Sequence, residues 1–377
     1  MTYQTILLFA CVALPSSLAN ILPIVGPQRY DVAITTASLT DSSRLDPFAN
    51  DGRQRSVVIS TFSPVSYCRK KEVQRYMPPA TAAFQNDKFA AYGLLNGSFQ
   101  SLRLETCSKS TSRGRDATLS FPLVLFSGAL GTSRMLYNSM LQSIAAAGYL
   151  AVSMDHPYDA DIVEYPYGTI ITDADLSTDA DVELTLKTRV EDFVFVHQHF
   201  TNTSVTSKQI LGHGKADCKR KTALIGHSLG GATAAAAMLR IPSALVALNL
   251  DGTMFGPVLE TGLDRHFMLI GHENKTQETD PSWKAIWPKL TGWKKEFEVK
   301  GAAHYSFSDL PLITSVLGLQ EMLPPQAGEV LGTVEGERMM KLTVTYVTAF
   351  LDMVLKSGGH GVLDGIHGDF PEVAEVS

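Results

Sequence analysis

The apolar run Thr222-Ala223-Leu224-Ile225 passes directly into Gly226-His227-Ser228-Leu229-Gly230-Gly231, and an alanine-rich run from Ala232 to Arg240 follows. A Gly-x-Ser-x-Gly pattern between a strand and a helix is typical of a nucleophile elbow, a turn so sharp that the serine hydroxyl stands clear of the backbone. Glycine is needed on both sides of such a serine because a Cβ would collide with the neighbouring strand or helix. The stretch therefore predicts a strand, a tight turn and a helix, with Ser228 as a nucleophile.

A serine nucleophile needs a base and a group that orients the base. In elbow-type folds the acid and then the histidine follow the serine along the chain, each after a strand. Asp251 directly follows the apolar run 244–250 and precedes a glycine, so we expect it to be the acid. Asp264 and Asp280 fit less well because neither ends a strand. Five histidines follow Asp251. We favour His304, which comes after the predicted strand 297–300 and a flexible Gly-Ala-Ala, with His272 as the alternative base.

The third requirement is an oxyanion hole, two backbone N–H groups that face the developing negative charge. In this kind of fold one N–H belongs to the residue after the nucleophile, here Leu229. The other comes from the loop that follows an earlier strand, here 121–126. That loop reads Ser-Gly-Ala-Leu-Gly over 127–131, and the sequence leaves Ala129, Leu130 and Gly131 as alternatives for the second donor.

Apolar strands alternate with helical patterns over most of the chain. The predicted strands span 121–126, 149–154, 222–225, 244–250, 266–270 and 297–300, and the predicted helices span 135–147, 179–200, 232–240 and 339–356. Such alternation predicts a mostly parallel sheet with helices on both faces. Together with the nucleophile elbow it indicates an α/β-hydrolase fold. Alternating residues over 29–39 and 56–62 add an antiparallel N-terminal edge. We expect one domain over 20–377, with an irregular insertion at 63–118 that holds one helix near 81–92, and an acidic, lid-like loop at 155–183.

The N-terminus resembles a secretory signal peptide. An apolar core over 6–14 is followed by Ser17-Leu18-Ala19, which places small residues at the −3 and −1 positions and suits cleavage before Asn20. We therefore expect residues 1–19 to be removed and the protein to be secreted. The net charge of −6 offers no basic surface for nucleic acid. No apolar stretch reaches the ~20 residues that a membrane span needs.

Cysteines and glycosylation motifs agree with export. Removal of the leader takes Cys11 with it and leaves Cys68, Cys107 and Cys218. Because Cys68 and Cys107 bracket a segment with several prolines and glycines, we expect them to form a disulfide, which leaves Cys218 as a buried thiol. Three Asn-x-Ser/Thr motifs are candidate glycosylation sites, at Asn96, Asn202 and Asn274.

Several of these motifs together resemble the secreted platelet-activating-factor acetylhydrolase family of α/β-hydrolases and its microbial homologues. The similar stretches are 121–127, Leu130-Gly131, 226–233, Leu250-Asp251-Gly252 and 300–304. The resemblance implies Ser228, Asp251 and His304 as the triad, with the Leu130 and Leu229 amides as the oxyanion hole. It also implies hydrolysis of short sn-2 acyl chains of phospholipids, such as 1-alkyl-2-acetylglycerophosphocholine, with no metal and no cofactor. The family usually has His-Gly before the hole leucine, where this chain has Gly128-Ala129.

Other ester substrates are alternatives, as in a general carboxylesterase or a polyester hydrolase, and a non-catalytic binding protein on the same fold is the non-enzyme alternative. Two further segments bear on substrate. The loop 155–183 carries nine acids and three tyrosines, which either bind a quaternary ammonium such as choline or form a solvated loop. Trp283, Trp287 and Trp293 lie among lysines, and this stretch either packs on the sheet, as we favour, or contacts a lipid surface. Nothing in the sequence implies an obligate protein partner.

Overall fold

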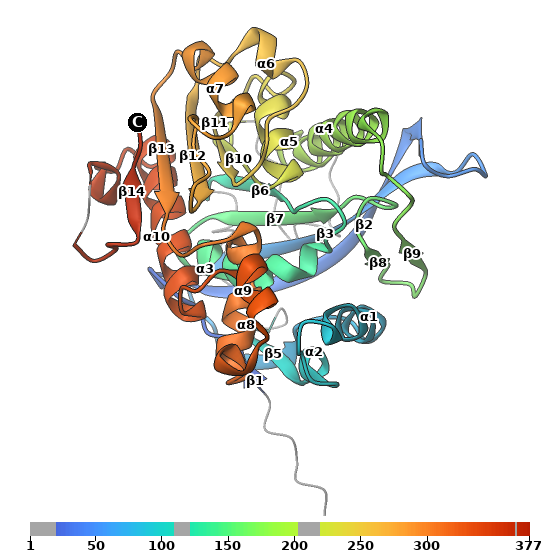
Figure 1. Cartoon of the computed structure of the whole chain (residues 1–377). Coiled ribbons are helices and arrows are strands. Elements are labelled where there is room, and N and C mark those ends of the chain that lie inside the picture. The colour runs from blue at the N-terminus through green and yellow to red at the C-terminus, as the bar shows by residue number, and fades with distance from the viewer. Residues whose placement is uncertain (1–19, 109–120, 203–218, 366–367) are drawn as a thin grey trace, which may run out of the picture.

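A nine-stranded mixed sheet forms the centre of the protein (Figure 1). The computed structural model describes residues 20–108, 121–202, 219–365 and 368–377, so the predicted leader and Cys218 lie outside the described residues. In spatial order the sheet contains β14 (Val373–Glu375), β13 (Lys294–Val299), β12 (His266–His272), β11 (Ala244–Leu250), β10 (Thr222–His227), β6 (Leu123–Ser127), β7 (Leu150–Asp155), β3 (Gln54–Val65) and β2 (Asp31–Leu45).

The six central strands run parallel and the two edges are antiparallel. Strand β10 lies between β11 and β6 and pairs in parallel with both. The predicted antiparallel N-terminal edge is present as the long β2–β3 pair, which joins the sheet through β7. The opposite edge, where β14 runs antiparallel to β13, was missed, because three residues are too short a strand to leave a periodic pattern. The parallel strands bring their carboxyl ends to one rim of the sheet.

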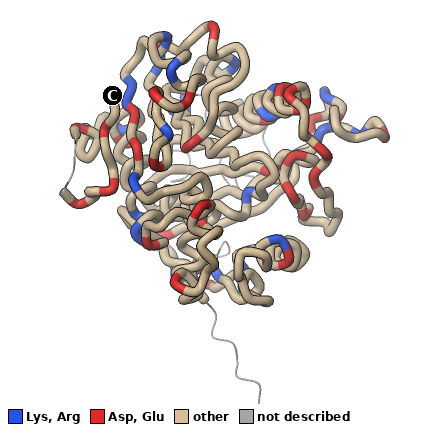
Figure 2. The backbone as a smooth tube through the Cα atoms, in the orientation of Figure 1, with Lys and Arg blue, Asp and Glu red and all other residues tan. Residues whose placement is uncertain are grey.

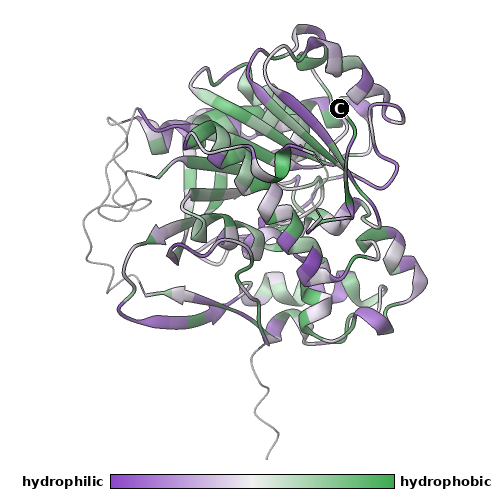
Figure 3. Cartoon of the chain, turned by 90° about the vertical axis from the view of Figure 1, so that its left-hand side faces the viewer, coloured by the Kyte–Doolittle hydropathy of each residue, from purple (hydrophilic) through white to green (hydrophobic). Residues whose placement is uncertain are grey.

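Helices cover both faces of the sheet, as the alternation of elements predicts. One face packs against α3 (Asn138–Ala146), α8 (Leu310–Val316) and α10 (Gly336–Leu355), and the other against α4 (Asp179–Thr201), α5 (Leu229–Met238) and α7 (Pro281–Ile286). In β10, Ala223 and Ile225 belong to the first core and Leu224 to the second, because successive side chains point to opposite faces. Figure 3 shows the resulting green, apolar strands between the two helical layers. The architecture is the α/β-hydrolase fold.

Residues 63–108, the described part of the expected insertion 63–118, are more ordered than the sequence suggests. It contains β4 (Lys71–Arg75), α1 (Pro79–Ala90), α2 (Ser98–Ser101) and β5 (Leu102–Cys107), and β1 (Asn20–Ile21) joins β5 and β4 in a second, three-stranded sheet. The helix expected near 81–92 is α1. Strand β4 was not predicted because it is almost entirely exposed and lacks an apolar face.

The acidic segment 155–183 contains the hairpin of β8 (Ile162–Glu164) and β9 (Ile170–Thr172) and the start of α4. Its acids gather beside these elements in Figure 2. The solvated-loop interpretation is wrong for the first part, because Asp155, Asp159 and Asp161 are buried and form ion pairs with Arg134, Arg189 and Lys88. It holds at α4, where Thr178 and Asp181 form a capping box at the helix N-terminus.

The tryptophan stretch packs against the body of the protein. Trp283 is fully buried and donates its indole N–H to the Gly252 carbonyl at 2.7 Å. Trp287 packs against the same core, and Trp293 stacks on Phe350 with ring centroids 5.2 Å apart. The packing interpretation therefore accounts for these three side chains. The remaining short helices are α6 (Val258–Thr261) and α9 (Pro325–Leu331). Across the described residues, every helix is too short or too polar to cross a bilayer.

Candidate active site

The turn at Ser228 has the geometry of a nucleophile elbow. Ser228 lies between β10 and α5 with φ +57° and ψ −126°, and a positive φ is one that residues with a side chain rarely adopt. A Cβ on Gly226 would lie 2.0 Å from the Gly230 carbonyl carbon, and one on Gly230 would lie 2.0 Å from the Ser127 carbonyl oxygen. Backbone atoms cannot move away from such contacts, so glycine is required at both positions.

Asp251 follows β11 and is placed by a second tight turn. Its φ is +58°, and its N–H donates to the Ile270 carbonyl at 2.8 Å. The Asn249 side chain closes the turn by accepting from the Gly252 N–H and donating to the Gly252 carbonyl, each at 2.7 Å. A Cβ on Gly252 would lie 2.1 Å from the Ser228 carbonyl oxygen, so this glycine lets the acid turn pack against the elbow.

The Asp251 carboxylate holds both histidines that the sequence leaves as alternatives. His304 donates from Nδ1 to Oδ2 at 2.5 Å, and His272 donates from Nδ1 to Oδ1 at 2.6 Å. The main-chain N–H of His272 also donates to Oδ1, at 2.9 Å. Only His304 lines the pocket that contains Ser228, whereas His272 lines the adjoining one. Of the two alternatives, His304 is therefore the histidine that shares a pocket with Ser228.

Electrostatics keep the acid charged. Burial by itself would raise the pKa of Asp251, but hydrogen bonds from His272 and His304 and the attraction of both rings hold it well below its usual range. An ionised Asp251 is what orients the imidazole of His304 and stabilises its cation. The Ser228 hydroxyl makes no hydrogen bond with a described residue, and in enzymes without substrate the serine–histidine bond is often long and tightens in the complex.

The structure chooses among the three alternatives for the oxyanion loop. The Ala129 N–H donates to the Tyr137 hydroxyl at 3.0 Å, and the Gly131 N–H donates to the Asp159 carbonyl at 3.0 Å. Within the described part of the chain, the Leu130 N–H has no acceptor, and Leu130 lines the pocket with Ser228 and Leu229. The Leu229 N–H is the first of α5 and has no helical carbonyl to bind. Leu130 and Leu229 thus supply the two uncommitted amides at this site.

The pocket itself is small. Its volume is ≈ 240 Å³, and its wall is mostly apolar, with Val182 and Phe255 among the lining residues. Binding sites for drug-sized ligands usually measure about 300–1,000 Å³. This hollow therefore suits a short acyl group beside Ser228. Thr253, Phe255 and Lys275 also line the adjoining pocket of ≈ 500 Å³, so the two hollows share a wall.

His227, between Gly226 and Ser228, connects the backbone of His304 to the oxyanion loop. The sequence did not reveal this role. His227 is fully buried, and its Nε2 donates to the His304 carbonyl at 2.8 Å. Its Nδ1 accepts from the Tyr137 hydroxyl at 2.9 Å. Burial, together with the nearby His304 ring, lowers the pKa of His227 to about 3, so the ring is neutral and keeps one tautomer. One hydroxyl, that of Tyr137, thus links the Ala129 amide to the backbone of His304.

A buried charge cluster supports the other side of the oxyanion loop. Arg189 donates to the Ala129 carbonyl at 3.2 Å, the Gly128 carbonyl at 2.7 Å and the Ser127 hydroxyl at 3.1 Å, and it pairs with Asp159. Because Arg189 binds the carbonyls of Gly128 and Ala129, the N–H groups of the oxyanion loop face away from Arg189. No sequence signal identified Arg189, because its partners lie 30 to 62 residues away.

Behind this loop, a second serine–histidine–aspartate series is fully enclosed. Ser127 donates to His156 Nε2 at 2.9 Å, and His156 Nδ1 donates to Asp192 at 2.9 Å. Asp192 also pairs with Arg55. All four side chains are buried, so no ester carbonyl reaches Ser127, and the series acts as internal support rather than as a second catalytic centre.

The other candidate residues lie away from the pocket. Cys68 and Cys107 form a disulfide with a Cα–Cα distance of 5.6 Å, which ties β5 to the segment before β4. Asn96, Asn202 and Asn274 are exposed, as a glycan requires. The serine and threonine of the Asn202 motif lie outside the described residues.

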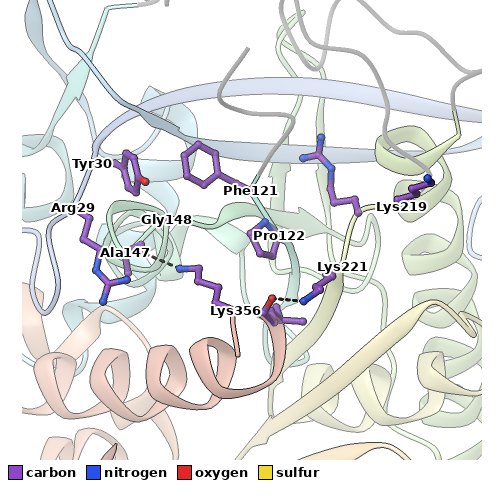
Figure 4. Close-up of a pocket in the computed structure, with 11 residues that line it drawn as sticks. Arg29, Tyr30, Phe121, Pro122, Ala147, Gly148, Lys219, Lys221 and Lys356 are labelled. Carbon is purple, nitrogen blue, oxygen red and sulfur yellow. Dashed lines mark hydrogen bonds between the residues drawn. The ribbon is translucent and has the colours of Figure 1, made fainter. Parts of the chain in front are cut away.

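A basic hollow of ≈ 480 Å³ lies at the opposite rim of the sheet (Figure 4). Two of its lysines bind carbonyls at helix ends: Lys221 donates to Leu355 at 2.8 Å and Lys356 to Ala147 at 3.0 Å. Cations there offset the negative ends of the helix dipoles of α10 and α3. We therefore assign these lysines a structural role.

Comparison with known proteins finds similarity over most of the chain. A family model described as platelet-activating factor acetylhydrolase, isoform II, matches residues 74–192 and 207–358. A protein of the fungus Arthroderma benhamiae named probable 1-alkyl-2-acetylglycerophosphocholine esterase is 29% identical over 372 residues, which cover 92% of this chain and 91% of that protein. Among solved structures, a ferulic acid esterase from Streptomyces cinnamoneus superposes with a TM-score of 0.79 and 28% identity, over 94% of this chain and 99% of that one.

Proposed function

This chain belongs to the family of platelet-activating factor acetylhydrolase, isoform II, and is a carboxylic ester hydrolase; we propose that it removes acetyl or other short acyl groups from the sn-2 position of phospholipids. One observation carries the proposal. The strained Ser228 lines a small pocket together with His304, whose Nδ1 donates to Asp251 at 2.5 Å. The hollow of ≈ 240 Å³ supports a short acyl group. The fungal relative's name supports the alkylacetyl phospholipid as substrate class.

In the proposed mechanism the Ser228 hydroxyl attacks the ester carbonyl while His304 Nε2 accepts its proton. The carbonyl oxygen becomes negative and accepts hydrogen bonds from the Leu130 and Leu229 N–H groups. Asp251 stabilises the imidazolium of His304, which then protonates the leaving alcohol, and an acyl-enzyme remains. Water, deprotonated by the same imidazole, hydrolyses this intermediate and restores Ser228. Every step uses groups of this chain, and none calls for a metal or cofactor.

Labelling and kinetics test the roles of these residues. A fluorophosphonate probe should label Ser228, and Ser228→Ala should abolish labelling. His304→Ala should lower kcat/KM on the order of 10⁴-fold or more, the usual cost of losing a member of a triad. His272→Ala is the matched control, because His272 contacts the same carboxylate from outside the pocket. A smaller loss in His304→Ala than in His272→Ala would contradict the assignment of the base.

A panel of phospholipids with sn-2 chains of increasing length tests the substrate. We expect kcat/KM to be highest for acetyl and to fall steeply as the chain outgrows the pocket. Equal rates for acetyl and for long chains would contradict a short-acyl pocket.

The ferulic acid esterase structure favours a second candidate, the hydrolysis of hydroxycinnamate esters. Such a substrate would place an aromatic acyl group, and not an acetyl group, beside Ser228. Methyl ferulate belongs in the same panel, and a higher kcat/KM for methyl ferulate than for the acetyl phospholipid would favour this second candidate.

We propose further that the protein is secreted and glycosylated. The disulfide between Cys68 and Cys107 supports an oxidising compartment, and the exposed Asn96, Asn202 and Asn274 support glycan attachment. Sequencing of the extracellular protein should yield Asn20 as the first residue. Treatment with a glycosidase that removes N-linked glycans should lower its apparent mass, and retention of residues 1–19 would contradict the proposal.

A further inference from the structure

The acid of the proposed triad is shared between two histidines. We propose that His272 is a positioning residue that holds the Asp251 carboxylate and, when protonated, competes with His304 for its charge, so that it sets the acid limit of ester hydrolysis. This inference rests on the proposed function, because it concerns the same triad. It assigns a role to a histidine that the reaction itself does not require.

Each carboxylate oxygen of Asp251 accepts a hydrogen bond from one imidazole ring. Oδ2 accepts from His304 at 2.5 Å, and Oδ1 accepts from the His272 ring at 2.6 Å. Because both rings donate from Nδ1, both keep Nε2 as their basic nitrogen. The two rings are similarly accessible, since their side chains are 38% and 34% exposed. His304 and His272 therefore have nearly equal access to protons and equivalent contact with one charge.

Their surroundings differ in what each ring can reach. His304 lines the pocket with Ser228, whereas His272 lines the adjoining hollow of ≈ 500 Å³. A proton on His272 therefore cannot come from the serine and must come from solvent. The other ionisable groups packed around His272 are the neutral His227 behind His304, Glu273 next in the chain, and the pair of Lys275 and Asp280 in the same hollow.

Protonation of His272 affects the reaction through the charge that Asp251 shares between the two rings. His304 becomes a cation in the transition state, and Asp251 is its counter-ion. If His272 already carries a proton, one carboxylate faces two cations, and the cation on His304 is less stabilised. Activity on the acid side is then lost through protonation of either ring. Because the two rings share one carboxylate, the first proton makes the second harder to add, so the protonations occur in two separate steps and the acid limb of the pH profile steepens only below the second step.

Two substitutions separate the effect of the His272 hydrogen bond to Asp251 from the effect of protonating His272. In His272→Asn the side-chain N–H occupies nearly the place of Nδ1–H and keeps the bond to Asp251, but it does not titrate between pH 4 and 9. His272→Ala removes both. His266→Asn is the matched control, because His266 lies on the same strand at its opposite end and does not line either pocket.

The experiment measures kcat/KM for a short-chain ester between pH 4 and 9. In the wild type and in His266→Asn, log kcat/KM should fall on the acid side in two steps, with a slope that increases from about one toward two, whereas in both His272 variants the slope should stay at about one. At pH 8, His272→Asn should retain more kcat/KM than His272→Ala, for which we expect a loss of about tenfold with KM little changed. A one-proton slope in the wild type that is unchanged in His272→Asn would overturn the proposal.

A readout without turnover separates this proposal from the assignment of the reaction. The two Nδ1–H protons bound to Asp251 should give two low-field ¹H NMR resonances, and His272→Asn should remove one of them. A single resonance in the wild type would overturn the shared carboxylate, whatever the activity. Absence of esterase activity with both resonances present would instead contradict the proposed function. If His272→Ala does not fold, His272→Asn alone decides the matter.

Discussion

The hydroxyl of Tyr137 is a small group with a large expected effect. It accepts the Ala129 N–H at 3.0 Å and donates to His227 at 2.9 Å, and the whole side chain is buried. Burial raises the pKa of Tyr137 above its usual value, so the hydroxyl keeps its proton and remains a donor. Tyr137→Phe removes one oxygen without changing the shape of the core.

The magnitude follows from the two groups left without a partner. An unsatisfied buried donor or acceptor costs about 1–3 kcal/mol, so we expect the loss of both partners to lower the free energy of unfolding by about 2–6 kcal/mol. Loss of one oxyanion donor lowers kcat by about 10²–10³-fold. Since Tyr137→Phe loosens the Gly128–Ala129 peptide, one peptide before the Leu130 N–H, but does not remove that N–H, we expect kcat to fall by about 10–100-fold, with KM little changed.

The assay combines urea denaturation with kcat and KM for a short-chain p-nitrophenyl ester. Tyr346→Phe is the matched control: this tyrosine is equally buried, but its hydroxyl has no hydrogen-bond partner among the described residues. The control should leave kcat unchanged and stability unchanged or slightly higher. A Tyr137→Phe enzyme with wild-type kcat and wild-type stability would refute the role of this hydroxyl.

Three further changes test other parts of the structure. Arg189→Ala leaves Asp159 charged and buried, which should lower the free energy of unfolding in urea by about 3–5 kcal/mol; a loss below 1 kcal/mol would contradict the buried pair. Replacing Cys68 and Cys107 by serine opens a loop with a sequence separation of 39 and should cost about 4 kcal/mol, and an unchanged melting temperature would argue against the disulfide. Burial lowers the pKa of His197 from 6.5 to about 4, so the folded state binds fewer protons than the unfolded state in that window, and stability falls as the pH drops below 6.5. At pH 5 this costs about 2 kcal/mol, which His197→Asn should recover relative to pH 7; equal pH dependence in the variant would contradict this.

Much of the scaffold was predictable because it depends on local patterns. The apolar runs before Gly226 and Asp251 are strands β10 and β11, and the alanine-rich run after Ser228 is helix α5. The strands that were missed are short or exposed to solvent. Strand β14 has three residues and β4 has no apolar face, so neither leaves a periodic signal.

The elbow can be inferred from neighbouring residues alone, because a turn that brings backbone within 2.0 Å of a missing Cβ admits only glycine at Gly226 and Gly230. The order of strands along the chain also places Asp251 and two histidines after strands. Which histidine lines the pocket of Ser228, and the binding of both to Asp251, depend on how the folded chain brings these segments together. The same holds for the free amide of Leu130, which depends on Tyr137 and Asp159 occupying the amides on either side. Hydrogen bonds between distant segments depend on where the sheet brings those segments together. The number of residues between two segments does not determine how far apart they lie in the folded chain.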